Sequence, residues 1–128
     1  MLTNQPPSPA AQALAQKMAA LHNRQDVDIA VLATEDGLAI NTDNPAAHKL
    51  AAAAGFTLAL TRQASVLLGL AESQEITMET TDGRFLVCVP FSAGFSRLVL
   101  AVVFRKKRSY KRLLQQTARA LQQTLEDF

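Results

Sequence analysis

The sequence has few of the residues that support covalent cross-links, metal binding or aromatic cavities. Its 128 residues include one cysteine, Cys88, two histidines, His22 and His48, and no tryptophan. A single cysteine excludes a disulfide framework. A structural zinc site needs about four ligands at recognisable spacing, which these three residues do not provide. We therefore expect neither a metal site nor a cofactor.

Glycine is also scarce, and its pattern excludes a nucleotide-binding enzyme. The five glycines stand apart from one another, so the sequence has no G-x-x-x-x-G-K or G-x-G-x-x-G motif. No nucleophile–base pair or carboxylate pair is recognisable, and Asp36 and Asp82 each precede a glycine in a predicted turn. We predict no catalytic residues and do not expect an enzyme.

Charge is sparse and apolar residues are abundant. Charged residues make up 19% of the chain and hydrophobic residues 48%, whereas an average soluble domain is roughly 25% charged. This balance suggests that a partner covers part of the surface. No apolar stretch is predicted to cross a bilayer, and the first residues lack the pattern of a secretory leader. We expect a cytoplasmic protein with a flexible lead-in at 1–8 and one domain at 9–128.

The net charge of +2 hides an uneven distribution. Residues 1–104 hold six basic and nine acidic side chains, a balance of −3, whereas residues 105–128 hold seven and two, a balance of +5. Three interpretations stay open: a solvated face, a docking surface for an acidic protein, or a contact with phosphate or anionic lipid. The basic cluster consists of Arg105, Lys106, Lys107, Arg108, Lys111 and Arg112, with Arg119 further along.

Hydrophobic periodicity predicts an α/β sandwich of the α+β type. Apolar residues at three- and four-residue spacing indicate helices, while alternating or continuous apolar runs indicate strands. Asp-Gly pairs at 36–37 and 82–83 indicate hairpin turns. The predicted order α-β-β-α-β-β-β-α gives a five-stranded, largely antiparallel sheet with helices on both faces. Helices are expected at 10–23, 46–71 and 109–126, and strands at 27–34, 38–42, 75–80, 84–91 and 97–104.

The last three predicted strands differ in polarity. Strands 84–91 and 97–104 are nearly continuous apolar runs, which is typical of central strands, whereas 75–80 is more polar and is expected at an edge. Pro90 has no backbone N–H, so we expect strand pairing to weaken near it.

The predicted helix 46–71 is the most informative segment. It is rich in alanine and has only a narrow polar strip, whereas a helix packed on one sheet has a broad polar back. We therefore expect it to be covered on two sides. Two stripes run along it, and the residues alone do not decide which one faces the sheet. One stripe is Leu50, Ala54, Leu58, Thr61, Ser65 and Leu68, and the other is Ala53, Phe56, Leu60, Ala64, Leu67 and Ala71.

Several local strings, in their order along the chain, resemble the roadblock/LC7 family. They are DIAVLATEDGLAI at 28–40, the alanine-rich helix, and TMETTDGRFLVCVPF at 77–91, followed by the last apolar strand and helix. The resemblance spans residues 10–125 and implies a roadblock-like, profilin-like fold that forms a homodimer or heterodimer. In such dimers the long helix lies against its mate, and the edge strand after it pairs with its symmetry copy.

The resemblance also implies a function. Family members are platforms for small Ras-like GTPases, and a single short chain is similar to the bacterial GTPase-associated type. We predict a homodimeric scaffold that binds and regulates such a GTPase. Two alternatives stay open: a small-molecule sensor of the PAS or profilin-like type, and a binder of nucleic acid or anionic lipid through the basic cluster. The predicted dimer interface is Leu50, Ala54, Leu58, Thr61, Ser65, Leu68, Ile76 and Met78. The predicted GTPase-binding residues are His48, Lys49, Ala52, Gly55, Ala59, Arg62 and Gln63.

Overall fold

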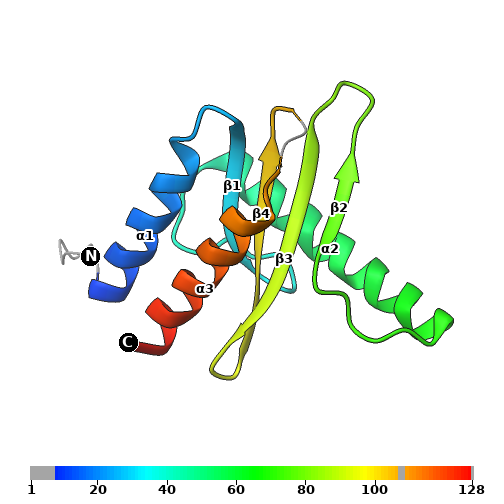
Figure 1. The fold of residues 1–128 in the computed structure, drawn as a ribbon. Coiled ribbons are helices and arrows are strands. Elements are labelled where there is room, and N and C mark those ends of the chain that lie inside the picture. Colours follow the sequence, from blue (N-terminus) through cyan, green and yellow to red (C-terminus); the bar gives the residue numbers. More distant parts are fainter. Residues whose placement is uncertain (1–7, 107–108, 128) are drawn as a thin grey trace.

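A computed structural model describes residues 8–106 and 109–127 of the chain. Three helices and four strands follow one another in the order α-β-α-β-β-β-α (Figure 1). The predicted order is therefore wrong by one strand. The elements are α1 (Pro9–His22), β1 (Val27–Thr34), α2 (Pro45–Leu68), β2 (Ile76–Glu79), β3 (Phe85–Ala93), β4 (Ser96–Phe104) and α3 (Lys111–Asp127).

The sheet is antiparallel, with the strand order β1-β4-β3-β2. The apolar strands β3 and β4 lie in the centre, and the four-residue β2 lies at an edge, as predicted. The pairing of β3 with β2 stops at Cys88, whereas its pairing with β4 continues past Pro90 to Ala93. Pairing near Pro90 is therefore reduced on one side only.

The predicted strand at 38–42 does not form, and the sheet has four strands in the described residues instead of five. After the 35–37 turn the chain makes one isolated bridge, between Ala33 and Ala39. Asn41 then adopts the left-handed conformation with φ of 58°, which turns the backbone away from the edge of β1. Its side-chain amide donates a hydrogen bond of 2.9 Å to the carbonyl of Ala11, which fixes this departure.

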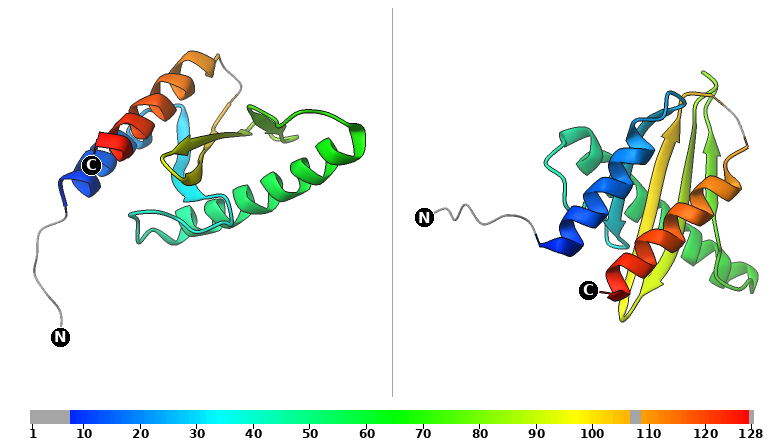
Figure 2. Two further views of the ribbon diagram at one scale, coloured as in Figure 1. Left: turned by 90° about the horizontal axis from the view of Figure 1, so that it is seen from below. Right: turned by 60° about the vertical axis from the view of Figure 1, so that its left-hand side comes forward.

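Helices cover both faces of the sheet, as predicted. Figure 2 shows α2 alone on one face and α1 beside α3 on the other. The α1/α3 side holds the larger core, which includes Leu14, Leu100 and Leu121. The α2 side holds a second core of smaller residues, including Ala51, Cys88 and Ala101.

The helix boundaries follow local signals in the sequence. Ser8 caps α1 by accepting a hydrogen bond from the N–H of Ala11 at 3.1 Å, and Asn44 caps α2 by accepting one from Ala46 at 3.0 Å. Each cap is followed by a proline at the first helical position. Gly69 ends α2 in the left-handed conformation, with φ of 68°, so the helix stops three residues before the predicted end.

Candidate partner-binding surface

A contact between two glycines seats α2 on the sheet. A Cβ atom added to Gly55 would lie 2.8 Å from the N and Cα atoms of Gly37, so the helix backbone lies directly against the 35–37 turn. This contact fixes which side of the helix faces inward. The residues buried on that inner side are Ala47, Leu50, Ala51, Ala54, Gly55 and Leu58.

Beyond Leu58 the helix leaves the sheet and its apolar side chains are open to solvent. Figure 1 shows its C-terminal end projecting past β2. Val66, Leu67 and Leu68 are 77%, 85% and 71% exposed. The other large exposed apolar residues of this region are Phe56, Leu60 and Leu70.

By length and composition alone, α2 could also cross a membrane, and it is the one such helix in the part of the chain that the structure describes. Its N-terminal half packs on the sheet through its inner side. The apolar outer side is open to solvent in the single chain.

The edge strand β2 extends this surface. Ile76 packs with the core on the α2 side of the sheet, and Met78, two residues further along, points to the same side because strand side chains alternate. Met78 is 53% exposed. Among the described residues no strand pairs with the outer edge of β2. Apolar side chains and an open backbone edge thus lie on the same part of the molecule.

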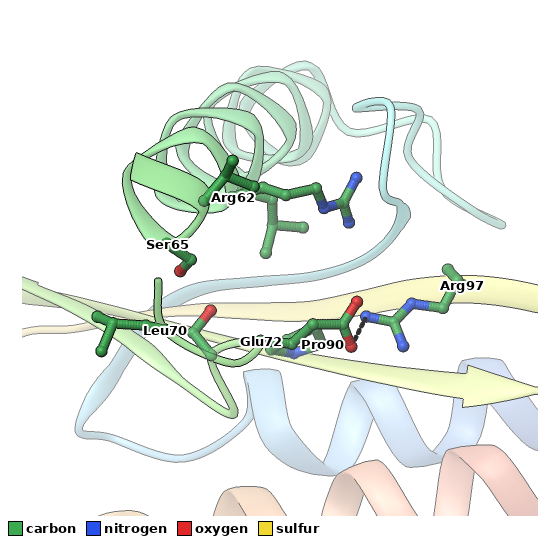
Figure 3. Close-up of a pocket in the computed structure, with 9 residues that line it drawn as sticks. Arg62, Ser65, Leu70, Glu72, Pro90 and Arg97 are labelled. Atoms are coloured by element: carbon green, nitrogen blue, oxygen red, sulfur yellow. Dashed lines mark ion pairs between the residues drawn. The ribbon is translucent and has the colours of Figure 1, made fainter. Parts of the chain in front are cut away.

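A cavity of about 200 Å³ lies between the second half of α2 and the sheet (Figure 3). Leu58, Val66 and Pro90 form apolar walls, while Arg62 enters from α2 and Arg97 from β4. The cavity therefore has an apolar floor with cationic side chains at its rim.

Glutamates neutralise both arginines of this cavity. Arg62 Nη2 lies 2.8 Å from Glu35 Oε2, Arg97 Nε lies 3.6 Å from the same oxygen, and Arg97 Nη2 lies 3.6 Å from Glu72 Oε2. Two cations and two anions give no excess charge. The network ties the 35–37 turn to α2 and β4.

The residues of the predicted dimer interface separate into two groups. Leu50, Ala54 and Leu58 are buried against the sheet of the same chain, which corrects their assignment to a face that meets a second copy. The others lie at the surface or partly so, and their contact with a second copy stays a prediction: Thr61, Ser65, Leu68, Ile76 and Met78.

The predicted GTPase-binding residues are exposed along α2 with one exception, although Arg62 points toward the sheet at the rim of the cavity. Gly55 is buried against Gly37 and is not available to a partner, so its assignment is corrected. His48 Nε2 lies 3.1 Å from the carbonyl oxygen of Thr42, at the start of the helix. The exposed or partly exposed residues of this set are His48, Lys49, Ala52, Ala59, Arg62 and Gln63.

Of the large exposed apolar residues in and just after α2, the predicted site includes Leu68 and omits the others. Phe56, Leu60 and Leu67 belong to the second apolar stripe, which the sequence pattern reveals without showing which way it faces. Val66 and Leu70 lie outside both stripes. Gly55 is the signal for the three stripe residues, because a glycine on an alanine-rich helix indicates a close backbone contact on its side and they lie roughly opposite; it gives no signal for Val66 or Leu70.

The remaining candidates for chemistry are the one cysteine and a metal site. Cys88 is fully buried in β3, and burial raises the pKa of its thiol to about 11, so it stays protonated at neutral pH and is a poor nucleophile. No cluster of metal-ligating side chains occurs in residues 8–106 and 109–127. Lys107 and Arg108 of the basic cluster lie outside the described residues.

Comparison with family models matches residues 14–104 to the Roadblock/LC7 domain. The fold is similar to that of the gliding protein MglB from Thermus thermophilus, with a TM-score of 0.75, 17% identity and 96% of each chain covered. It is also similar to Myxococcus xanthus MglB, with a TM-score of 0.62, 20% identity and 90% of each chain covered. A Roadblock/LC7 domain from Streptomyces avermitilis is similar as well, with a TM-score of 0.60 and 20% identity. The match covers 88% of this chain and 91% of that domain. Comparison with curated protein sequences gives no match.

Proposed function

The chain belongs to the Roadblock/LC7 family, and on that premise we propose that two copies form a homodimer that serves as a docking platform for a small Ras-like GTPase. The observation that carries the proposal is the apolar outer side of α2. Phe56, Leu60 and Leu67 lie on that side and are 68%, 51% and 85% exposed in the single chain. Contiguous apolar surface of this kind on a soluble domain marks an interaction site.

Dimerisation through α2 and β2 accounts for both open features of this region. Leu60, Leu67 and Leu68 each contribute about 1.5–3 kcal/mol when they are fully buried, so covering them strongly favours association. Pairing of the outer edge of β2 with a second copy satisfies its free backbone groups and extends the sheet. One similar solved structure, MglB in a tetrameric arrangement, is itself an assembly of copies, with a TM-score of 0.73 at 18% identity.

A GTPase is the partner that the family resemblance implies. The proposed binding side chains, among them Lys49 and Gln63, are polar and lie around the small residues Ala52 and Ala59 on α2. Small side chains permit close approach of a partner backbone, while the polar ones supply hydrogen bonds at the rim. We place the dimer in the cytoplasm, where such GTPases act.

The proposed role is regulation by contact, without a donated catalytic side chain. In some GTPase activators an arginine enters the partner's site and stabilises the transition state. Here Arg62 is held by Glu35 of its own chain at 2.8 Å, so reaching a partner requires breaking that ion pair. We therefore assign Arg62 to the platform surface and not to catalysis.

The small-molecule sensor has less support. Such a sensor needs a sizeable cavity in the sheet-and-helix core. Leu100, Leu114 and Leu121 are at most 1% exposed and fill the centre of the larger core, while the hollow of about 340 Å³ between α1 and the 40–44 segment opens to solvent.

The test of the GTPase proposal is nucleotide-dependent capture from the native lysate. The immobilised protein should retain a GTP-binding protein in one nucleotide state, with a GTP analogue or with GDP. Ala52→Arg, on the open side of α2, should abolish retention. Ala20→Arg places the same side chain on an exposed position of α1 and should have no effect. Failure to retain any GTP-binding protein in either state, or equal retention by Ala52→Arg, contradicts the proposal.

A further inference from the structure

The charges of α3 are arranged against the dipole of the helix. Lys111 and Arg112 occupy its first turn, and Glu126 and Asp127 occupy its last. A helix N-terminus carries partial positive charge and a C-terminus partial negative charge, so both ends are placed unfavourably for stability. The helix is held by its buried apolar side, so its exposed charges are free to serve another purpose.

Three exposed cations lie on this helix and a fourth, Lys106, lies in the segment between β4 and α3; we call the four the basic face. Arg112 and Arg119 are seven residues apart, two helical turns, and therefore lie on the same side of α3. Lys111 adjoins Arg112, and Lys106 follows the end of β4. None of the four makes an ion pair within residues 8–106 and 109–127. In contrast, the nearby arginines are paired with aspartates: Arg24 with Asp26, Arg84 with Asp28 and Asp82, and Arg105 with Asp28.

The neighbouring helix reinforces the positive charge. The α1 helix lies beside α3 on the same side of the sheet (Figure 2) and contains no acidic residue, while Lys17 adds another cation. The only acidic residues of α3 are at its far end. The partner that complements this side of the molecule is therefore an extended anionic surface.

We propose that the basic face binds the surface of an anionic lipid bilayer. Such binding needs only a set of unpaired cations on a convex surface, and each one near the membrane strengthens binding by about fivefold. The apolar side of α3 packs in the core through Leu114, Ala118 and Leu121, so the helix binds at the bilayer surface without inserting into the hydrocarbon.

A bilayer fits this surface better than a nucleic acid. Single-stranded nucleic acids bind through aromatic stacking, and the aromatic residue beside the basic face is Tyr110. Its ring packs on Phe85 and Phe104, with ring centroids 5.4 and 6.0 Å away, and its hydroxyl donates to Glu75 at 2.6 Å. That ring is therefore not offered to a base.

Membrane binding through α3 leaves the proposed platform free. The basic face and α2 lie on opposite sides of the sheet (Figure 2), so one surface can meet lipid while the other meets a second copy and a GTPase. The inference does not depend on the GTPase proposal, and vesicle binding tests it with the purified protein alone.

The experiment is co-sedimentation with vesicles made of equal parts phosphatidylcholine and phosphatidylserine. The wild type should bind these vesicles, should not bind phosphatidylcholine alone, and should be released by salt. Lys111→Gln with Arg112→Gln should weaken binding about 25-fold, from two charges at about fivefold each. Gln116→Lys, which adds a cation to the exposed side of α3, should strengthen binding by about fivefold.

The matched control places the same change in net charge at the other end of the sheet. Phe95→Glu with Ser96→Glu alters the exposed β3–β4 hairpin by two charges and should leave vesicle binding unchanged. Equal weakening by both double variants would show that net charge alone acts and would overturn the proposal. So would an absence of binding to phosphatidylserine vesicles, or displacement of the protein from them by duplex DNA at equal phosphate concentration.

Discussion

Gly55 lies against Gly37 so closely that a Cβ atom at position 55 would stand 2.8 Å from two backbone atoms of the 35–37 turn. Backbone atoms cannot move aside as the end of a flexible side chain can. This one contact sets the rotation of α2 about its axis. It therefore decides which apolar stripe enters the core and which remains at the surface.

Gly55→Ala tests this contact, because two effects of the substitution oppose each other. Alanine favours helix over glycine by about 1 kcal/mol, but a clash with backbone in a packed core costs about 1–3 kcal/mol. We expect the clash to prevail and the free energy of unfolding to fall by about 1 kcal/mol. Denaturant unfolding measures it, with Ala53→Ser, at an exposed neighbouring position, as the control. An increase in stability would show that α2 is not fixed by this contact.

The orientation of α2 is the part of the site that the sequence leaves open. Both of its stripes consist mainly of leucine, alanine and small polar residues, so hydrophobicity alone does not distinguish them. The distinction arises from a contact between residues 18 positions apart, Gly37 and Gly55, which hydrophobic periodicity does not encode. Three side chains of the predicted interface consequently belong to the core.

Local signals, in contrast, predict most of the fold. Ser8 and Asn44, each followed by proline, mark the starts of α1 and α2 because their side chains satisfy free backbone N–H groups. The apolar runs mark the central strands β3 and β4. The strand predicted at 38–42 fails to form for a tertiary reason. The hydrogen bond from the Asn41 side chain to the Ala11 carbonyl joins residues that are distant in sequence.

Tyr110 should titrate well above the usual range of tyrosine. Partial burial and the hydrogen bond to Glu75 raise its pKa from 10.0 to about 12. It is the only tyrosine and the chain has no tryptophan, so ultraviolet absorbance of tyrosinate reports on it alone. Glu75→Gln should lower this pKa, because the negative partner is removed. A midpoint near 10.0 in the wild type would show that the contact does not form in solution.

The same shift makes stability depend on alkaline pH. The folded chain holds the Tyr110 proton more tightly than the unfolded chain, so this contribution is complete below pH 10.0 and is lost as pH rises toward about 12. Tyr110→Phe has no proton to lose and should show a smaller decrease in unfolding free energy over that range. Its stability at neutral pH should be lower by about 1 kcal/mol, the usual contribution of one hydrogen bond. Identical pH profiles for both proteins would contradict the assignment.

The outer side of α2 gives the most direct test of the proposed platform, because Leu67 is 85% exposed and contributes little to the fold of a single chain. Leu67→Arg should prevent association while leaving the circular dichroism spectrum unchanged. Phe95→Arg, on the exposed β3–β4 hairpin, is the control and should associate normally.

The decisive measurement is the mass in solution, by light scattering at micromolar concentration. We predict twice the chain mass of 13.8 kDa for the wild type and the control, and the mass of one chain for Leu67→Arg. A wild-type protein with the mass of one chain would contradict the proposal that α2 and β2 join two copies into a docking platform.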